Sequence, residues 1–367
     1  MIELEAEELK NRLDLLVVGA GNAGCIVSDN LYGWQEEVRL LALDTDSSAL
    51  MNLRSPARIQ VGADTARGFG TAENPETAKR AVLDDRERID GMIASPDIVF
   101  IIAGLGGGVG TGAAPLIAEM AGEAGALSVA IATMPFIFEG KKRIENARAG
   151  LKELHEKADA LIVIPNEDLF SQVDPESFLA EAFRQAGEMM LEVVKNICEI
   201  MMNPGVFNVD LPRIRQILGK SGLARFGSGE AEGTERWSAA LESALKSPLM
   251  QGVKINAADN VLMHISGGRD LTQDEIQKIS SHLYSKAGDI HGVTGVTVDK
   301  KLGKKIKVWL LFAGLKGDPV ELSGALPESS AAESPARYGR AGKFSGMEDE
   351  LDIPAIFRRK KRENNES

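Results

Sequence analysis

The chain has 367 residues, 44% hydrophobic and 26% charged, a composition typical of a globular protein large enough for two packed domains. A formal net charge of −12 argues against a nucleic-acid partner, because phosphate binding needs a basic surface. No apolar run is long enough for a transmembrane segment, the N-terminus lacks a secretory signal, and two cysteines (Cys25 and Cys198) suit a reducing compartment, so we expect a cytoplasmic protein.

The first half of the chain alternates short apolar runs with helix-like stretches, the pattern of a parallel sheet covered by helices. Nearly every residue in these runs is apolar, as expected when both faces of a sheet are buried. The predicted strands are Leu13–Gly19, Val38–Asp44, Asp97–Ala103, Leu127–Thr133 and Ala160–Pro165. Glycine-rich or Asn/Asp-rich turns follow several of them, where ligands bind in open α/β sheets.

A long helix is expected next, from about Glu181 to Met202. Its apolar residues recur at helical spacing over a wide stripe, so the helix should be buried on much of its circumference. Asn203-Pro204-Gly205 ends it. Its methionines are interpreted as core packing between two domains.

A second, smaller unit follows this helix. Its predicted strands are Asn260–Ser266, Gly292–Val298 and Lys305–Phe312. Thr272-Gln273-Asp274-Glu275 has the form of a capping box that begins a helix. Beyond Leu315 the residues Gly, Pro, Ser, Ala and Glu dominate, and this composition predicts a flexible linker.

The sequence therefore predicts an α/β fold with a parallel-sheet domain, a long central helix, a smaller α/β C-terminal domain, a flexible linker and a terminal peptide. The four histidines lack the spacing of metal ligands, so no metal site built from protein side chains is expected. The expected divisions are an N-terminal extension at 1–12, a nucleotide-binding domain with the central helix at 13–202, a C-terminal domain at 203–316, a linker at 317–347 and an interaction peptide at 348–367.

The strongest chemical signal is the segment Gly104-Leu105-Gly106-Gly107-Gly108-Val109-Gly110-Thr111-Gly112, between a predicted strand and an Ala-rich helix. Glycines let backbone N–H groups point into a common concavity, and the helix N-terminus adds a positive dipole end. A flexible linker would gain nothing from so many glycines between a buried strand and a helix. The segment predicts a phosphate-binding loop.

A second glycine loop lies earlier, at Gly19-Ala20-Gly21-Asn22-Ala23-Gly24, with Asp44 twenty residues beyond Gly24. Alone, it is a fair dinucleotide-binding fingerprint, with Asp44 on a ribose. An NAD(P)-dependent oxidoreductase would explain this loop, but it does not require the other one, and a persuasive catalytic His or Lys–Tyr pair is missing. Two glycine loops on one sheet need a common explanation.

The pair of loops, in this order, resembles the tubulin/FtsZ family, and within it the FtsZ proteins of bacteria and archaea. The resemblance runs from about Leu13 to Phe312 and resumes in the tail. Gly106–Gly112 matches the family's G-G-G-T-G-T-G signature except at Val109, which replaces a threonine. The likeness implies a cytoplasmic GTP-binding GTPase that polymerises head to tail into filaments for cell division, at the division site or inner membrane surface, with GTP and Mg²⁺ as cofactors.

Other segments carry the resemblance around the nucleotide. Asp44-Thr45-Asp46 resembles the family's second nucleotide loop, and Gly68-Phe69-Gly70-Thr71 with Asn74-Pro75 its third, near the γ-phosphate. Thr133–Arg143 resembles the sugar-binding loop, which implies Glu139 on the ribose and Arg143 near the sugar and phosphates. The implied GTP-binding residues are Gly21, Asn22, Ala23, Gly24, Cys25, Asp44, Thr45, Gly70, Thr71, Gly106, Gly107, Gly108, Val109, Gly110, Thr111, Gly112, Pro135, Glu139, Arg143, Asn166, Phe183 and Glu188.

Three of these assignments depend on the resemblance alone. Taken singly, Arg143 would be interpreted as a surface charge, Phe183 as a core residue and Asn166 as a turn former. The family likeness places Asn166 and Phe183 against guanine. At Glu188 the family uses an Asp to read the guanine amino edge, and Gly187 replaces an Asn beside it.

The resemblance also implies hydrolysis between subunits, where one copy binds GTP and the next inserts an acidic loop at the γ-phosphate. Asn208 and Asp210 fit the loop pattern Asn-x-Asp-x-x-Asp/Glu, whereas Arg213 departs from it, because a guanidinium has no acceptor with which to orient water. Arg213 either weakens hydrolysis, which we favour, or stabilises phosphate charge as an arginine finger does. The alternative function is a hydrolysis-deficient scaffold that copolymerises with an active relative.

These departures, with Cys25 where the family usually has Asn, suggest a divergent paralogue. In the tail, Leu351–Arg359 resembles the family's C-terminal peptide, which docks on membrane tethers and regulators. A short apolar motif with basic flanks suits groove binding or an acidic surface, although a disordered charged terminus would also fit. The residues expected to bind partners are Leu351, Asp352, Ile353, Pro354, Phe357 and Arg358.

Overall fold

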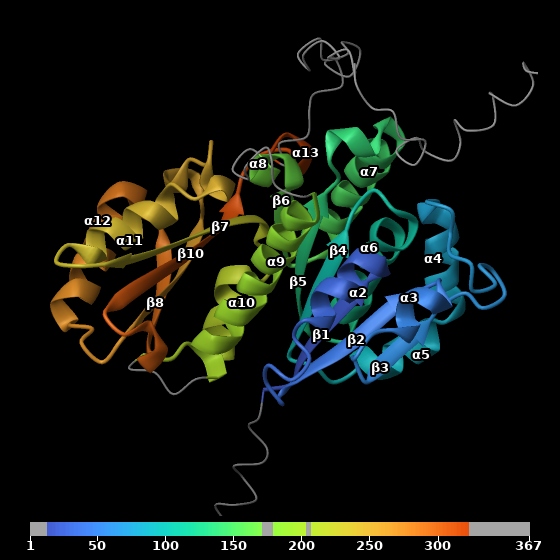
Figure 1. Cartoon of the computed structure of the whole chain (residues 1–367), viewed down its shortest axis with the longest axis horizontal. Coiled ribbons are helices and arrows are strands. Elements are labelled where there is room, and N and C mark those ends of the chain that lie inside the picture. Colours follow the sequence, from blue (N-terminus) through green and yellow to red (C-terminus); the bar gives the residue numbers. More distant parts are fainter. Residues whose placement is uncertain (1–12, 171–178, 203–206, 323–367) are drawn as a thin grey trace, which may run out of the picture. The chain divides into compact units, whose positions relative to one another are not determined.

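The molecule is built on one mixed sheet, with strands in the order β3-β2-β1-β4-β5-β6-β7-β10-β8-β9 (Figure 1). The computed structural model describes residues 13–170, 179–202 and 207–322. The strands are β1 (Leu15–Ala20), β2 (Val38–Asp44), β3 (Ala57–Gln60), β4 (Ile98–Gly104), β5 (Leu127–Met134), β6 (Ala160–Pro165), β7 (Gly222–Glu232), β8 (Asn260–Gly267), β9 (His291–Val298) and β10 (Lys305–Leu315).

Helices cover this sheet on both faces and confirm the predicted α/β class. The α-helices are α2 (Gly21–Asp29), α3 (Ser47–Met51), α4 (Pro75–Asp84), α5 (Arg86–Ile93), α6 (Gly108–Glu123), α7 (Lys141–Lys157), α8 (Asn166–Phe170), α9 (Leu179–Met202), α10 (Leu211–Leu218), α11 (Arg236–Leu245), α12 (Gln273–Ala287) and α13 (Pro319–Leu322). Single 3-10 turns are η1 (Ile137–Glu139), η2 (Pro248–Met250), η3 (Ile255–Ala257) and η4 (Lys300–Leu302). None of the helices within the described ranges combines the length and apolarity that a bilayer crossing requires.

The first six strands run parallel, as the apolar runs of the five predicted ones indicate; the short β3 was not predicted. Successive side chains of β1 alternate between the two faces: Leu15 and Val17 join the cluster under α9 and α10, whereas Leu16 and Val18 join the one under α4 to α7. Both faces are therefore buried. Each of the five predicted strands of this half is confirmed to within two residues.

Strand β7 joins the parallel half to the rest of the sheet and was not predicted. It pairs parallel with β6 over three residues and antiparallel with β10. Its sequence lacks an apolar alternation because glycine is required where α11 rests on it: a Cβ on Gly227 would lie 2.1 Å from the carbonyl oxygen of Ala244. The two units expected from the sequence thus share one continuous sheet.

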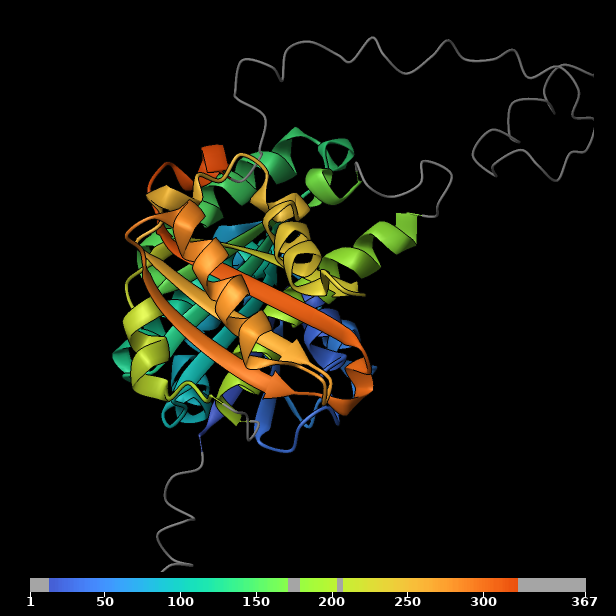
Figure 2. The same ribbon diagram turned by 90° about the vertical axis from the view of Figure 1, so that its left-hand side faces the viewer.

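The C-terminal strands carry α11 and α12 on one face (Figure 2). Strands β10 and β8 are antiparallel, and β9 runs parallel to β8. The predicted capping box is confirmed: Thr272 Oγ1 accepts from the Glu275 N–H at 3.2 Å, and Glu275 accepts from the Thr272 N–H at 2.9 Å. Glu275 also pairs with the buried Arg236 of α11, at 2.7 Å, which joins the two helices.

Helix α9 runs along the middle of the molecule, from beside α8 to the opposite edge of the sheet (Figure 1). Its 24 residues extend over about 36 Å. About three-quarters of the way along, Asn196 accepts a hydrogen bond from His264 of β8 at 3.1 Å, because the Asn196 amide N–H already donates to the Glu192 carbonyl. The other ring nitrogen of His264 accepts from Thr297 of β9 at 2.9 Å. This buried network fixes α9 to the C-terminal strands.

The predicted linker differs from the structure at its start. Pro319–Leu322 forms helix α13, which contacts α7. The remainder of the predicted linker, the terminal peptide at 348–367 and the extension at 1–12 lie outside the described residues. So do the predicted partner-binding residues from Leu351 to Arg358.

Candidate nucleotide-binding site

The carboxyl ends of β1 and β4 form a crevice at the point where the strand order reverses. These two strands pair in parallel, with Ala20 opposite Ala103, while β2 follows on one side and β5 on the other. Ligands of open α/β sheets bind at such a point. A pocket of about 1120 Å³ opens there. The predicted site residues that line it are Gly21, Asn22, Ala23, Asp44, Thr45, Gly70, Thr71, Gly107, Gly108, Val109, Gly110, Glu139, Arg143, Asn166 and Phe183.

The floor of the pocket is the N-terminus of α6. Gly107 is the N-cap and makes no side-chain capping bond, so the first N–H groups of the helix face the pocket without a side-chain acceptor. Gly106 lies in the left-handed region, with φ 103°, and its N–H donates to Thr111 Oγ1 at 2.8 Å. Backbone N–H groups at a helix N-terminus form an anion-binding site.

Three loops converge on this helix end, and close contacts leave no room for larger residues. A Cβ on Gly110 would lie 2.2 Å from the Gly104 carbonyl oxygen, and one on Gly108 would lie 1.9 Å from Thr71 Oγ1. The loop after β1 packs against the loop after β4, because Gly21 approaches Gly110 closely. The glycine-rich sequence is therefore a packing requirement as well as a source of free N–H groups.

The loop before α4 has a strained backbone. Arg67, Ala72 and Glu73 have φ values of 50°, 48° and 62°, and they are three of the four described non-glycine residues with positive φ. Each costs about 1 kcal/mol or more, and such strain persists where surrounding contacts fix it, often at functional sites. Asn74 ends the loop as the N-cap of α4, where its side chain accepts from Glu76 at 3.0 Å.

Two acids at the end of β2 border the opposite wall. Asp44 is buried, and burial raises the pKa of its carboxyl group. It accepts from the Asp46 N–H at 2.9 Å, and Asp46 caps α3. Cys25 lies behind Asp44, donates to the Gly19 carbonyl at 3.2 Å, and does not line the pocket. Burial raises the pKa of the Cys25 thiol to about 12, so it stays protonated.

The third wall comes from α8 and the first half of α9. Asn166 is buried, and within the described residues its Oδ1 has no hydrogen-bond partner, which leaves an acceptor for a ligand. Phe183 is 46% exposed and packs edge-on against Phe136 at 5.2 Å between ring centres. A flat aromatic face beside an amide acceptor suits a nucleobase that carries N–H donors.

Among the described residues that line the pocket, Arg143 is the cation, and it is paired with two acids. Its Nε donates to Glu73 at 2.9 Å, and its Nη1 donates to Glu139. Glu139 also accepts from the Phe136 N–H at 2.8 Å. The arginine therefore lies at the junction of the strained loop, α7 and η1.

The structure does not bring all the predicted residues to the pocket surface. Gly24, Cys25, Gly106, Thr111, Gly112 and Pro135 lie behind the lining residues. Glu188 is not among the lining residues; it pairs with Arg184 and lines a different cleft, between α9 and the C-terminal strands. Its neighbour Gly187 borders the pocket instead, because adjacent helix positions differ by about 100° in direction.

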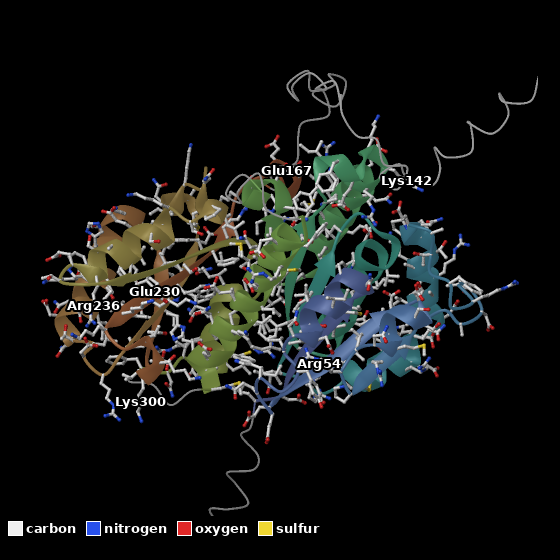
Figure 3. The ribbon with its side chains drawn as sticks, in the orientation of Figure 1. Arg54, Lys142, Glu167, Glu230, Arg236 and Lys300 are labelled. Carbon is white, nitrogen blue, oxygen red and sulfur yellow. The ribbon has the colours of Figure 1, made fainter. Side chains whose placement is uncertain are left out.

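The predicted catalytic residues lie at the far end of α9. Met190 borders the pocket, and the helix continues for about 18 Å to Met202. Asp210 caps α10, accepts from the Arg213 N–H at 3.2 Å, and lies 4.0 Å from the Arg213 guanidinium. Figure 3 shows Lys142 and Glu167 at the edge where the parallel strands end, and Lys300, which follows β9, at the opposite edge.

The loop that carries Asn208 and Asp210 is held in place by backbone contacts. Val209 is buried, and its N–H donates to the Ile200 carbonyl at 3.2 Å. Phe207 forms an antiparallel bridge with Val296 of β9. Asn208 and Asp210 are exposed on this fixed loop, and Arg213 is exposed in the first turn of α10. One copy of the chain therefore cannot bring Asp210 to its own pocket.

Comparison with known proteins agrees with this geometry. Residues 14–174 match the GTPase domain of the Tubulin/FtsZ family, and residues 222–316 match the C-terminal domain of the FtsZ family. The cell division protein FtsZ of Pseudomonas aeruginosa is 35% identical over 345 residues, which are 93% of this chain and 86% of that protein. The chain belongs to the FtsZ family.

Other FtsZ proteins give the same picture. The cell division protein FtsZ 1 of Archaeoglobus fulgidus is 36% identical over 306 residues, 83% of each chain. A solved structure described as an empty FtsZ dimer from M. jannaschii is 36% identical, has a TM-score of 0.79 and covers 85% of this chain and 91% of that one. FtsZ membership confirms the resemblance and makes GTP the expected occupant of the pocket.

Proposed function

We propose that this FtsZ-family chain binds GTP in the glycine-lined pocket, assembles head to tail into filaments for cell division, and hydrolyses GTP where two copies meet. The observation that carries the proposal is the separation of the pocket from Asp210 by about half the length of α9. A site completed by a neighbour's opposite end repeats without closing, and such contacts produce filaments.

Each wall of the pocket has a part in holding GTP. The N–H groups at the start of α6 bind the phosphates, with the helix dipole favouring their charge. Asn166 Oδ1 accepts from a guanine N–H, and Phe183 packs on the base. Glu139 accepts from the ribose hydroxyls, and Arg143 lies beside the phosphates.

Mg²⁺ is proposed as the partner of the phosphates. In the described part of the chain, the acidic side chains that line the pocket are Asp29, Asp44, Asp46, Glu73 and Glu139, whereas Arg143 is the cationic one. A triphosphate brought into this acidic surrounding needs further positive charge. Bound Mg²⁺ would supply that positive charge beside the phosphates.

Asp210 of the next copy is proposed to orient the attacking water, since its carboxylate is exposed and held by its capping bond. Arg213 provides no acceptor for that water. Its guanidinium is exposed, so it enters the contact between copies as a positive charge. We expect it to slow hydrolysis and prolong the life of GTP-bound filaments.

The proposal favours an active division protein over the hydrolysis-deficient scaffold, because the matched family model is a GTPase domain and the relatives are cell division proteins. The family match also sets aside an NAD(P)-dependent oxidoreductase. Docking of the 348–367 peptide on membrane tethers or regulators stays a prediction from the sequence. So does attachment at the division site.

One preparation tests the central proposal. The purified chain should bind GTP, release phosphate with Mg²⁺ present, and sediment only when GTP is added. Light scattering should rise with GTP and fall as the GTP is consumed. A chain that stays monomeric with GTP and Mg²⁺, or that ignores guanine nucleotides, contradicts the proposal.

A further inference from the structure

We propose that Glu73 competes with the phosphates of the bound nucleotide for Arg143, and thereby sets the affinity of the pocket for GTP. The inference rests on the proposed function, because it takes a guanine nucleotide as the occupant. Neither the glycine motifs nor the family match assigns a role to Glu73. The observations that carry it are one ion pair, its position beside the phosphate loop, and the charges around it.

The first observation is where Arg143 lies. Its guanidinium joins Glu73, at 2.9 Å, to Glu139 across the wall of the pocket, and all three residues line that wall. Its backbone lies against the phosphate loop, since a Cβ on Gly106 would lie 2.9 Å from the Arg143 carbonyl oxygen. A phosphate held by the start of α6 therefore comes within reach of this arginine.

The two carboxylates that hold Arg143 differ in how firmly they are fixed. The Glu139 side chain is 14% exposed and also accepts from the Phe136 N–H, so it stays in place. The Glu73 side chain is 46% exposed. An ion pair exposed to this degree is weak in water. Glu73 is therefore the partner that a phosphate displaces.

The charge of the lining makes this exchange costly for the nucleotide. Arg143 is the cation among the lining residues that the structure describes, and it is already matched by Glu73 and Glu139. A phosphate can pair with Arg143 only when one of these two carboxylates releases the arginine. Glu73 must then turn toward solvent or lie as a like charge beside the phosphates, and both outcomes lower the affinity.

The backbone keeps Glu73 at the pocket throughout. The Asn146 side chain donates to the Glu73 carbonyl at 3.1 Å and to the Gly106 carbonyl at 3.3 Å, which joins the strained loop to the phosphate loop. The exchange therefore requires rotation of the Glu73 side chain and no movement of the loop. Removal of the charge alone should reveal its effect.

Glu73→Gln removes the charge and keeps the length of the side chain. We expect the affinity for a non-hydrolysable GTP analogue to rise about fivefold at low ionic strength, with a smaller gain at high salt. Calorimetric titration with Mg²⁺, below the concentration of assembly, measures it. The matched control is Glu76→Gln, whose exposed carboxylate pairs with Lys79 and does not line the pocket, and which should leave the affinity unchanged.

A double substitution decides the mechanism. In an Arg143→Gln chain, which binds the analogue more weakly, the added Glu73→Gln change should give less than about a twofold gain. An equal gain in both backgrounds would indicate general repulsion and overturn the inference, as would an unchanged or lower affinity of Glu73→Gln. If the unmodified chain binds no guanine nucleotide, the proposed function fails first and the inference fails with it.

Discussion

The two ends of α9 present opposite kinds of chemistry. At one end, backbone N–H groups and closely packed glycines form the proposed phosphate site, and a substitution there changes the shape of the loop itself. At the other end, a buried Val209 and a backbone bridge at Phe207 fix a loop whose exposed side chains are proposed to act in hydrolysis. The first end depends on the absence of side chains, and the second on their identity.

This difference explains where the chain can depart from its family without unfolding. Asn208 and Asp210 lie exposed on a loop that is fixed by other residues, and Arg213 lies exposed in the first turn of α10, so all three can vary while the backbone stays in place. Gly108 and Gly110 have no such freedom, because a Cβ would overlap Thr71 at the first position and the Gly104 carbonyl at the second. Turnover can therefore change more readily than nucleotide binding.

The largest effect should come from the glycine end. Gly110→Val places a side chain against the Gly104 carbonyl, 2.2 Å from the Cβ position, and displaces the start of α6. We expect at least about a 100-fold loss of GTP affinity, measured by equilibrium titration. GTP binding within about tenfold of the unmodified chain would show that the loop tolerates a side chain there.

The matched control lies in the same helix. A Cβ on Gly122 would meet nothing within 4 Å, so Gly122→Ala should keep GTP affinity and raise stability by up to about 1 kcal/mol through helix propensity. Thermal unfolding measures this gain. Equal losses of GTP affinity in both variants would mean that general helix damage, and not the loop, is the cause.

A substitution at the Asp210 end of α9 should lower GTP turnover and leave GTP binding unchanged. Asp210→Asn retains an N-cap for α10 but removes the negative charge that orients water. We expect GTP turnover in assembled protein to fall about 10- to 100-fold, with unchanged affinity for GTP in the monomer. Mixed with unmodified chains, the variant should lower turnover at each joint that it completes. Unchanged turnover would remove Asp210 from the mechanism.

The buried network of Asn196, His264 and Thr297, which lies between the two ends of α9, should make the free energy of unfolding depend on pH. Burial lowers the pKa of His264 to about 4, whereas an unfolded histidine titrates near 6.5. The unfolded chain therefore takes up a proton that the folded chain excludes, and stability falls as pH falls from about 6.5 to 4, by about 2 kcal/mol. Denaturant unfolding across this range measures the slope.

The substitution His264→Gln tests whether His264 causes this loss of stability at low pH. The variant should be less stable at pH 7, because Asn196 and Thr297 lose their partner, but its stability should change less between pH 6.5 and 4. The exposed His291 provides a control, since His291→Gln should keep the slope of the unmodified chain. An unchanged slope in His264→Gln would assign the acid sensitivity to other groups.

The smallest effect should come from Arg213. Arg213→Asp restores the acid of the family pattern, and we expect GTP turnover in assembled protein to rise about three- to tenfold. Arg213→Gln removes the positive charge without adding a carboxylate, so GTP turnover should rise less than with Asp. No gain with Asp would contradict the proposed slowing. A loss with both would favour the arginine-finger interpretation.

The parallel half of the fold could be predicted because its signals are local. Each strand from β1 to β6, apart from the short β3, is a continuous apolar run, and the glycine loops follow directly in the chain. The helix start at Thr272 was likewise readable from its capping residues. These features need no knowledge of distant contacts.

The rest depends on contacts that the sequence does not display. Strand β7 was missed because its glycines are required by close contact with α11, which comes later in the chain. Glu188 was assigned to guanine although Gly187 borders the pocket, since a helix rotation of one position decides which side chain faces inward. Glu73 lay inside a loop that the family likeness indicated, but its pairing with Arg143 across 70 positions appears only in three dimensions.

The bridge between Phe207 and Val296 has a mechanical consequence. Two backbone hydrogen bonds, at 3.4 and 3.0 Å, tie the Asp210 loop to β9, and a third ties Val209 to α9. In the proposed filament, force that pulls neighbouring copies apart or tilts one on the next would be carried through these bonds into the C-terminal strands. The timing of phosphate release along a bent filament would then depend on how far these strands yield under load.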